Sequence, residues 1–85
     1  MKEFLYKIKD EVGIHARPAG LLVKKAAEFN SDIKIVCGEK TADAKKIFAV
    51  MALGAKCGND ITVTVDGADE DVAIAELEKF FKENL

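Results

Sequence analysis

Two hydrophobic periodicities alternate along this chain, and their order limits the folds that it can adopt. Apolar residues recur at every second position around Phe4, Ile33 and Ile61, which is typical of half-buried strands. Elsewhere they recur every three or four positions, which indicates amphipathic helices. The predicted order is strand, helix, strand, strand, helix, strand, helix. We therefore expect an α+β fold in which three helices cover one face of a mainly antiparallel, four-stranded sheet.

The limits of these segments follow from the apolar pattern and from its breaks at turn-forming residues. The predicted strands comprise residues 4–8, 33–37, 40–43 and 61–65. The predicted helices comprise residues 18–29, residues 46–53 and a last segment that opens at residues 69–71. The buried stripe of the first helix is expected to be Ala19, Leu22, Ala26 and Phe29. The buried stripe of the last helix is expected to be Ala73, Leu77 and Phe80.

Length and charge restrict the classes of protein to which the chain can belong. With 85 residues, 49% of them hydrophobic, the chain is expected to bury one core and form a single domain over residues 1–85. Its 13 Lys and Arg against 15 Asp and Glu give a net charge of -2, which argues against a nucleic-acid partner. No apolar run approaches the roughly 18 to 20 residues of a membrane span, and the first residues resemble a strand rather than a signal peptide. We expect a cytoplasmic protein without membrane insertion.

The two cysteines, Cys37 and Cys57, lack the Cys-x-x-Cys spacing of a zinc or redox site. The chain also has a single His, so a four-ligand metal site is difficult to assemble. Buried or half-buried free thiols are the favoured interpretation, and a disulfide is the alternative. We expect no metal.

The motif His15-Ala16-Arg17-Pro18 stands where the first predicted helix begins. Pro18 suits a first helical turn, because the N–H that it lacks would have no intrahelical partner there. His15 or Ala16 is expected at the cap position, and neither offers the side-chain oxygen that usually binds the first amides. A helix start attracts anions, and the Arg17 guanidinium suits phosphate oxygens. We therefore predict a phosphate-binding site formed by Ala16, Arg17 and Pro18.

His15 itself is the candidate nucleophile. Its imidazole is mostly neutral near pH 7, and the positive end of a helix further disfavours the charged form. A neutral imidazole attacks electrophilic phosphorus, and the product would be an anion beside Arg17. The hypothesis is that His15 becomes phosphorylated, with His15 and Arg17 as the catalytic pair. The alternative is that His15 only caps the helix while Arg17 is solvated.

The segment GIHARPAG, followed in order by KKIFAVMALGAKCGNDITVTVDGADE, resembles the histidine-containing phosphocarrier (HPr) family of the bacterial sugar phosphotransferase system. The similarity extends over essentially the whole chain. It implies an open-faced β-sandwich of order βαββαβα, without a cofactor. It also implies that His15 accepts a phosphoryl group on Nδ1 from phosphorylated enzyme I, which draws it from phosphoenolpyruvate, and passes it to enzyme IIA. By the same resemblance Arg17 steadies the phosphoryl group and Pro18 shapes the helix start.

The short helix is apolar on nearly every side, although a two-layer protein can bury only one. Plotted at about 100° per residue, Val50 and Leu53 share one arc, and Ile47, Phe48 and Met51 share another. We expect the first arc to pack and the second to meet a partner, and the resemblance places that second arc beside His15. Core packing of all five side chains is the alternative. The complete predicted interface of this expected monomer is Gly20, Leu21, Lys24, Ile47, Phe48 and Met51.

Four lysines are expected to add either a positive rim that steers acidic partners or an ordinary solvated face, namely Lys24, Lys25, Lys45 and Lys46. Many relatives, especially in Gram-positive bacteria, carry a regulatory Ser at the position of Lys46, and a lysine cannot accept a phosphate as that hydroxyl does. The only Ser is Ser31, so we do not expect the familiar serine switch. Two alternative functions stay open: a non-catalytic anion-binding regulatory module, and a carrier in a nitrogen-type or dihydroxyacetone-kinase phosphorelay.

Overall fold

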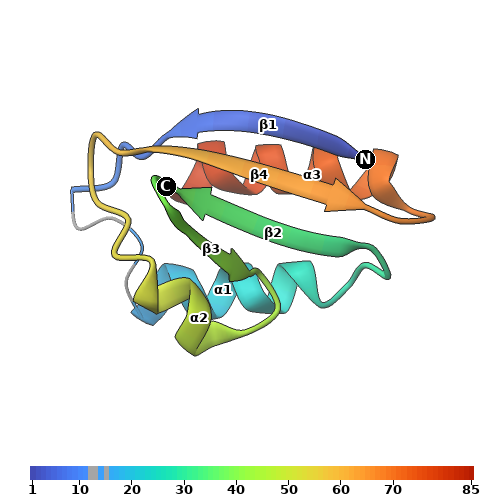
Figure 1. The fold of residues 1–85 in the computed structure, drawn as a ribbon, viewed down its shortest axis with the longest axis horizontal. Coiled ribbons are helices and arrows are strands. Elements are labelled where there is room, and N and C mark those ends of the chain that lie inside the picture. The colour runs from blue at the N-terminus through green and yellow to red at the C-terminus, as the bar shows by residue number, and fades with distance from the viewer. Residues whose placement is uncertain (12–13, 15) are drawn as a thin grey trace.

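The computed structural model describes residues 1–11, 14 and 16–85. Over these residues the elements follow the predicted order βαββαβα (Figure 1). The strands are β1 (Lys2–Lys7), β2 (Asp32–Cys37), β3 (Lys40–Asp43) and β4 (Asp60–Asp66). The helices are α1 (Ala16–Ala26), α2 (Ile47–Ala52) and α3 (Glu70–Asn84).

The four strands form one antiparallel sheet in the spatial order β1-β4-β2-β3. Figure 1 shows α3 behind β1 and β4, with α1 and α2 near β3 at the lower edge of the sheet. Helix α1 contacts both other helices. The expected α+β fold, with one face of the sheet covered and the other open, is confirmed.

The core lies between the sheet and the helices. In β4 the alternate residues Ile61, Val63 and Val65 are buried, while Thr62 and Thr64 are half-buried on the opposite face. The alternation predicted from the sequence therefore separates the covered face from the open one. In α1 and the turn after it, the whole predicted stripe is buried, namely Ala19, Leu22, Ala26 and Phe29.

Two details of the helices differ from the expectation. The buried stripe of α3 ends at Phe81, because steps of four residues from Ala73 and Leu77 lead there, and Phe80 is only half-buried. Helix α1 ends at Ala26 rather than at Phe29. Phe29 instead lies in the turn that follows, where its backbone N–H donates to the carbonyl of Ala26.

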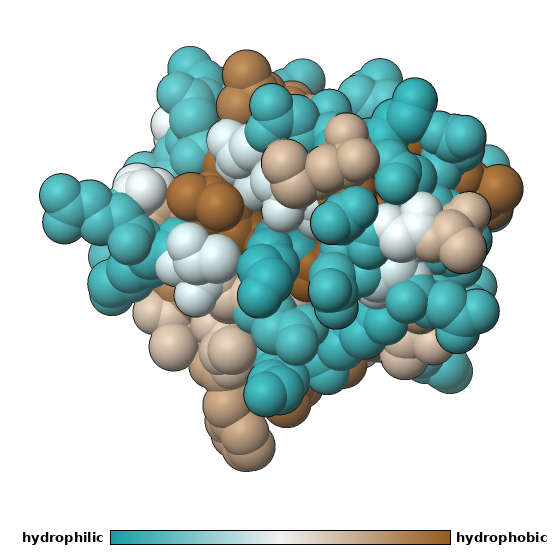
Figure 2. Space-filling model, turned by 45° about the vertical axis from the view of Figure 1, so that its right-hand side comes forward, coloured by the Kyte–Doolittle hydropathy of each residue, from teal (hydrophilic) through white to brown (hydrophobic). Residues whose placement is uncertain are grey.

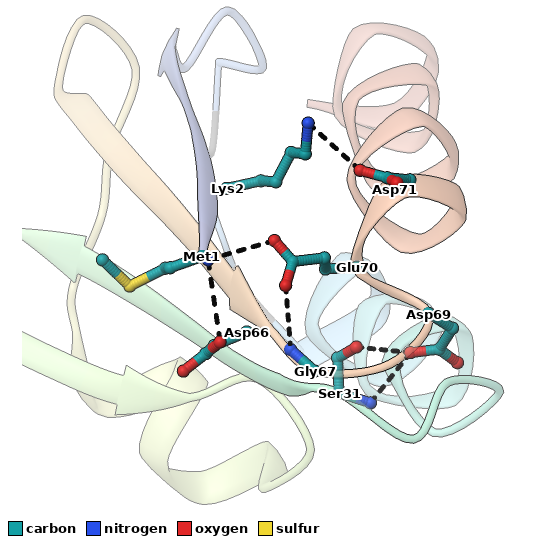
Figure 3. A network of polar contacts seen from close by, with 8 residues as sticks. All are labelled: Met1, Lys2, Ser31, Asp66, Gly67, Asp69, Glu70 and Asp71. Carbon is teal, nitrogen blue, oxygen red and sulfur yellow. Dashed lines mark hydrogen bonds and ion pairs between the residues drawn. The ribbon is translucent and has the colours of Figure 1, made fainter.

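At one end of the sheet, Asp69 ties the start of α3 to the loop between α1 and β2 (Figure 3). Its carboxylate accepts hydrogen bonds from the Ser31 hydroxyl, from the Asn30 backbone N–H at 2.9 Å and from the Ser31 backbone N–H at 3.0 Å. The Ser31 hydroxyl and the Asn30 amide hold the pKa of Asp69 below its usual range. Ser31, the only Ser of the chain, is therefore a buried structural residue.

Beside this clamp, charged groups join the start of β1 to the start of α3 (Figure 3). The Met1 ammonium lies 3.1 Å from a Glu70 carboxylate oxygen and 3.7 Å from Asp66. The hydrogen bond to Glu70 raises the pKa of the Met1 amine. Lys2 pairs with Asp71 at 3.1 Å. All of these groups except the half-buried Glu70 are exposed, so the pairs position the strand more than they stabilise it.

The Asp69 clamp predicts how stability depends on pH. Because folding lowers the pKa of Asp69, its charged form stabilises the folded state above the ordinary aspartate value of 3.8, and this contribution is lost as the pH falls through the folded pKa. We expect Asp69→Asn to flatten the acid limb of a plot of unfolding free energy against pH, measured by urea denaturation. Asp60→Asn, at an exposed position of β4, is the control. Identical acid limbs for wild type and Asp69→Asn would contradict the prediction.

Candidate functional site

In the first turn of α1, the side chains of Arg17 and Pro18 differ in their exposure to solvent. Arg17 is exposed and Pro18 is buried, and the predicted place of Pro18 in the first helical turn is confirmed. Ala16 is the first helical residue rather than the cap, so that alternative is wrong. His15 lies outside the described residues.

Backbone hydrogen bonds anchor the segment between β1 and α1. The Ile14 N–H donates to the carbonyl of Ala55 at 2.9 Å, and the Ile14 side chain is buried. The N–H groups of Lys9 and Asp10 donate to the carbonyl of Leu85 at 2.5 and 2.8 Å. The segment that leads into the His-x-Arg-Pro motif is thus attached both to the loop before β4 and to the residue that follows α3.

A hollow of about 250 Å³ lies at this end of α1, lined by Asp10, Arg17, Pro18, Leu21 and Asn84. Three segments of the chain thus meet at the hollow: the first turns of α1, the segment after β1 and the last residue of α3.

Of the residues that line this hollow, Arg17 and Pro18 were predicted to bind phosphate and Leu21 to meet a partner, whereas Asp10 and Asn84 were not predicted. Asp10 precedes the His-x-Arg-Pro motif by a few residues, so its acidic side chain can be noticed from the sequence next to the motif. Asn84 gives no such signal, because only the packing of α3 on β1 and β4 brings the end of the chain to the start of α1.

Two of the three interface residues predicted on α1, Leu21 and Lys24, lie on its exposed face together with Arg17. Arg17, Leu21 and Lys24 follow the spacing i, i+4, i+7 and share one face, and all three are exposed. Gly20 faces α2 instead: a Cβ built on it would lie 3.8 Å from Ile47 Cδ1. The structure thus brings Gly20 and Ile47 together at the contact between the two helices.

Helix α2 divides its apolar side chains largely as predicted. Val50 and Leu53 are buried, whereas Phe48 is 82% exposed and Met51 39% exposed. Ile47 is half-buried and packs against the core, so it is only partly available. In Figure 2 hydrophobic surface projects at the lower edge of the molecule, the level at which α2 lies in Figure 1. Core packing of all five side chains is therefore wrong.

The expected rim of four lysines is only partly present. Lys24 and Lys46 are exposed, but the Lys45 ammonium donates to the carbonyl of Phe29 at 2.8 Å. Lys25 lies 3.6 Å from Glu28 and over the ring of Phe29. These partners hold two of the four ammonium groups near the end of α1, and the steering of acidic partners by the four lysines stays a prediction.

Both cysteines are free thiols, and the disulfide alternative is wrong. Cys37 is half-buried as expected, but Cys57 is exposed because it lies in the surface loop before β4. Among the described residues, His, Cys, Asp and Glu side chains form no group of three that could hold a metal ion. Over the same part of the chain, no helix has the length and apolar character needed to span a bilayer.

Residues 2–83 match the protein family described as "PTS HPr component phosphorylation site". The chain belongs to the HPr family. It is 44% identical over 79 residues to the phosphocarrier protein HPr of Mycoplasma capricolum subsp. capricolum, with 93% of this chain and 89% of that relative covered. A solved mycoplasma histidine-containing phosphocarrier protein superposes with a TM-score of 0.94 at 41% identity, covering 96% of this chain and 93% of that one.

The family assignment confirms the resemblance seen in the sequence and makes this HPr-family protein a phosphocarrier of the phosphotransferase system. A further solved relative, 38% identical with a TM-score of 0.77, is an HPr dimer from Thermoanaerobacter tengcongensis; the match covers 98% of this chain and 95% of that one. Dimers therefore occur among the relatives of this chain.

Proposed function

We propose that residues 1–85 act as one cytoplasmic HPr domain in which His15 carries a phosphoryl group between enzyme I and enzyme IIA. In the first transfer, the phosphorus atom exchanges its bond to the donor enzyme for a bond to His15 Nδ1. In the second transfer, the bond to Nδ1 breaks and a bond to enzyme IIA forms. The observation that carries the proposal is the exposed Arg17 in the first turn of α1, two residues after His15.

The local charges suit such a step. No acidic residue occupies the first turn of α1, so no carboxylate of that turn competes for its free N–H groups. The positive end of the helix favours the neutral imidazole, whose Nδ1 lone pair attacks without prior loss of a proton. The amides of Ala16 and Arg17 and the Arg17 guanidinium then bind the phosphoryl oxygens. Pro18 fixes the backbone of this turn.

The exposed faces of α1 and α2 supply the partner surface of this proposal. Leu21, Phe48 and Met51 offer apolar anchors, and Lys24 adds a positive charge at the edge. Phe and Met side chains adapt to differently shaped partners, as successive docking of two enzymes requires. We propose that the protein binds both enzymes as a monomer, because each enzyme has to reach the start of α1 to exchange the phosphoryl group.

The proposal is tested by incubating the purified protein with enzyme I and labelled phosphoenolpyruvate. We expect an acid-labile, alkali-stable label on the protein, and its disappearance when enzyme IIA is added. Absence of the label, where a known HPr is labelled, would refute the proposal. If phosphate binding that depends on Arg17 were found without labelling, the anion-binding module would be the correct function.

Phe48→Ala is expected to weaken binding to both enzymes about tenfold, because a well-placed aromatic anchor contributes about 1 to 2 kcal/mol or more to an interface. The 82% exposure of Phe48 leaves little folding energy to lose. Titration calorimetry and the KM of enzyme I for the protein measure the effect. Leu5→Ala is the matched control, since Leu5 is 76% exposed on the open face of the sheet. Equal affinities for wild type and Phe48→Ala would remove Phe48 from the interface.

A further inference from the structure

We infer that two copies of this chain pair weakly through the free edges of their β1 strands, so that their two sheets join into one. The inference concerns the free protein and does not rest on the proposed function. It starts from the position of β1 at one edge of the sheet, where β4 is its only strand neighbour over the residues that the structure describes. A free strand edge presents backbone N–H and C=O groups that a second strand can bind.

The side chains of β1 alternate between the two faces of the sheet. On the covered face, Phe4 is buried and Tyr6 is half-buried. On the open face, Glu3, Leu5 and Lys7 are all exposed, and Leu5 is 76% exposed. The open side of this edge therefore carries a carboxylate, a large apolar side chain and an ammonium group, in that order.

This order of side chains is complementary to itself. Two β1 strands related by a two-fold axis perpendicular to the sheet run antiparallel. With the axis at Leu5, the two Leu5 side chains lie opposite each other, and Glu3 of each copy lies opposite Lys7 of the other. Residues directly opposite in an antiparallel pair have Cβ atoms about 4.5 to 5.5 Å apart, close enough for an ion pair. The same register places Phe4 of each copy opposite the half-buried Tyr6 of the other.

The neighbouring registers of the same two strands lack this match. An axis at Phe4 would place Glu3 opposite Leu5, and an axis at Tyr6 would place Lys7 opposite Leu5. In both cases a charged side chain faces a leucine rather than an opposite charge. The cross-strand pairs therefore favour a single register, with the axis at Leu5.

The opposite edge of the sheet is less suited to such a pair. Strand β3 has four residues, whereas β1 has six. Lys40 and Asp43 are three positions apart in β3, so they lie on opposite faces and cannot form reciprocal pairs across a two-fold axis. Helix α2 contacts β3 and lies with it at the far edge from β1 in Figure 1. A pair through β1 therefore leaves the exposed face of α2 uncovered.

The contact is small, so the pair is weak. Six residues of one strand bury less than the roughly 1,000 Å² that a stable interface needs. We expect a dissociation constant of about 0.1 to 1 mM at physiological salt. The micromolar protein of the labelling assay is then a monomer, as the proposed docking requires.

Sedimentation equilibrium of the whole protein at up to about 1 mM tests the pairing. We expect a dimer for wild type that dissociates on dilution. Glu3→Lys and Lys7→Glu should each weaken it about tenfold or more, because like charges then face each other at both ends. An equimolar mixture of these two variants should form a heterodimer, since one copy then presents only lysines and the other only glutamates. The double variant should pair like wild type.

Lys34→Glu is the matched control, because it changes the net charge as much as Lys7→Glu does. Lys34 is exposed on the open face of β2, an inner strand of the sheet, and should not affect the pairing. Recovery of the dimer in the mixture and in the double variant supports the inference. A wild-type protein that is monomeric at about 1 mM, a dimer that persists in Glu3→Lys, or equal weakening by Lys34→Glu would overturn it. A dimer that does not dissociate on dilution would also overturn it.

Discussion

Complete loss of phosphoryl acceptance is the expected result for His15→Ala. An alanine has no lone pair that can form a bond to phosphorus, and the neighbouring cation Arg17 is not a nucleophile. Enzyme I and labelled phosphoenolpyruvate should therefore leave this variant unlabelled, while the wild-type protein acquires an acid-labile label. The loss should amount to the whole signal rather than to a change in rate.

The composition of the chain makes this test decisive. His15 is its only histidine, so an acid-labile label that persists on His15→Ala would place the phosphoryl group on another type of side chain and contradict the assignment. Circular dichroism and a urea titration serve as the folding control. A variant that is folded and unlabelled supports the proposal. If the variant were unfolded, His15→Gln would replace it in the same assay, with the same expected loss.

Arg17→Ala is expected to slow phosphoryl transfer by about 10- to 150-fold. A hydrogen bond to a charged group contributes about 1.5 to 3 kcal/mol, and about 1.4 kcal/mol corresponds to a factor of ten in rate. Because Arg17 is exposed, its loss should change the free energy of unfolding by no more than about 0.5 kcal/mol. Rapid-quench measurement of transfer from enzyme I and urea denaturation together separate these two effects.

Lys24→Ala is the matched control for this variant. Lys24 lies on the same exposed face of α1 and carries the same charge, but it does not line the hollow. Its removal should weaken encounter with acidic partners and reduce the salt dependence of binding, without slowing transfer inside the complex. A large loss of stability in Arg17→Ala together with a normal transfer rate would contradict the proposed role of the guanidinium.

The sequence was sufficient for the order of the elements and for most of the core. Two patterns indicate which side chains face the interior: the alternation in β4 and the spacing of Leu22 and Ala26 in α1. Each pattern follows from the geometry of a single strand or helix, so it can be seen in the sequence. The register along the end of a helix is less determined. Phe80 and Phe81 are adjacent aromatic residues that follow Leu77 at steps of three and four, and the ring of Phe81 is the one that packs against Phe4 and Tyr6 of β1.

The residues of the candidate site were also only partly predictable from the sequence. Arg17 and Pro18 were predictable because a helix start is a local feature that short motifs report. The presence of Asp10 and Asn84 in the same hollow was not predictable, since these residues come near the start of α1 only through the tertiary arrangement. The contact of Lys45 was missed for the same reason: its partner, the carbonyl of Phe29, comes from an earlier part of the chain.

The contact between Gly20 and Ile47 holds α1 and α2 side by side, and each helix carries exposed residues. A standard protein interface covers about 800 Å² of each partner, and this molecule exposes 5055 Å² in total. Two enzymes that both reach the start of α1 would bind to overlapping surfaces, so the donor has to dissociate before the acceptor can bind. The throughput of such a relay depends on dissociation, and brief, weak docking would serve it better than a long-lived complex.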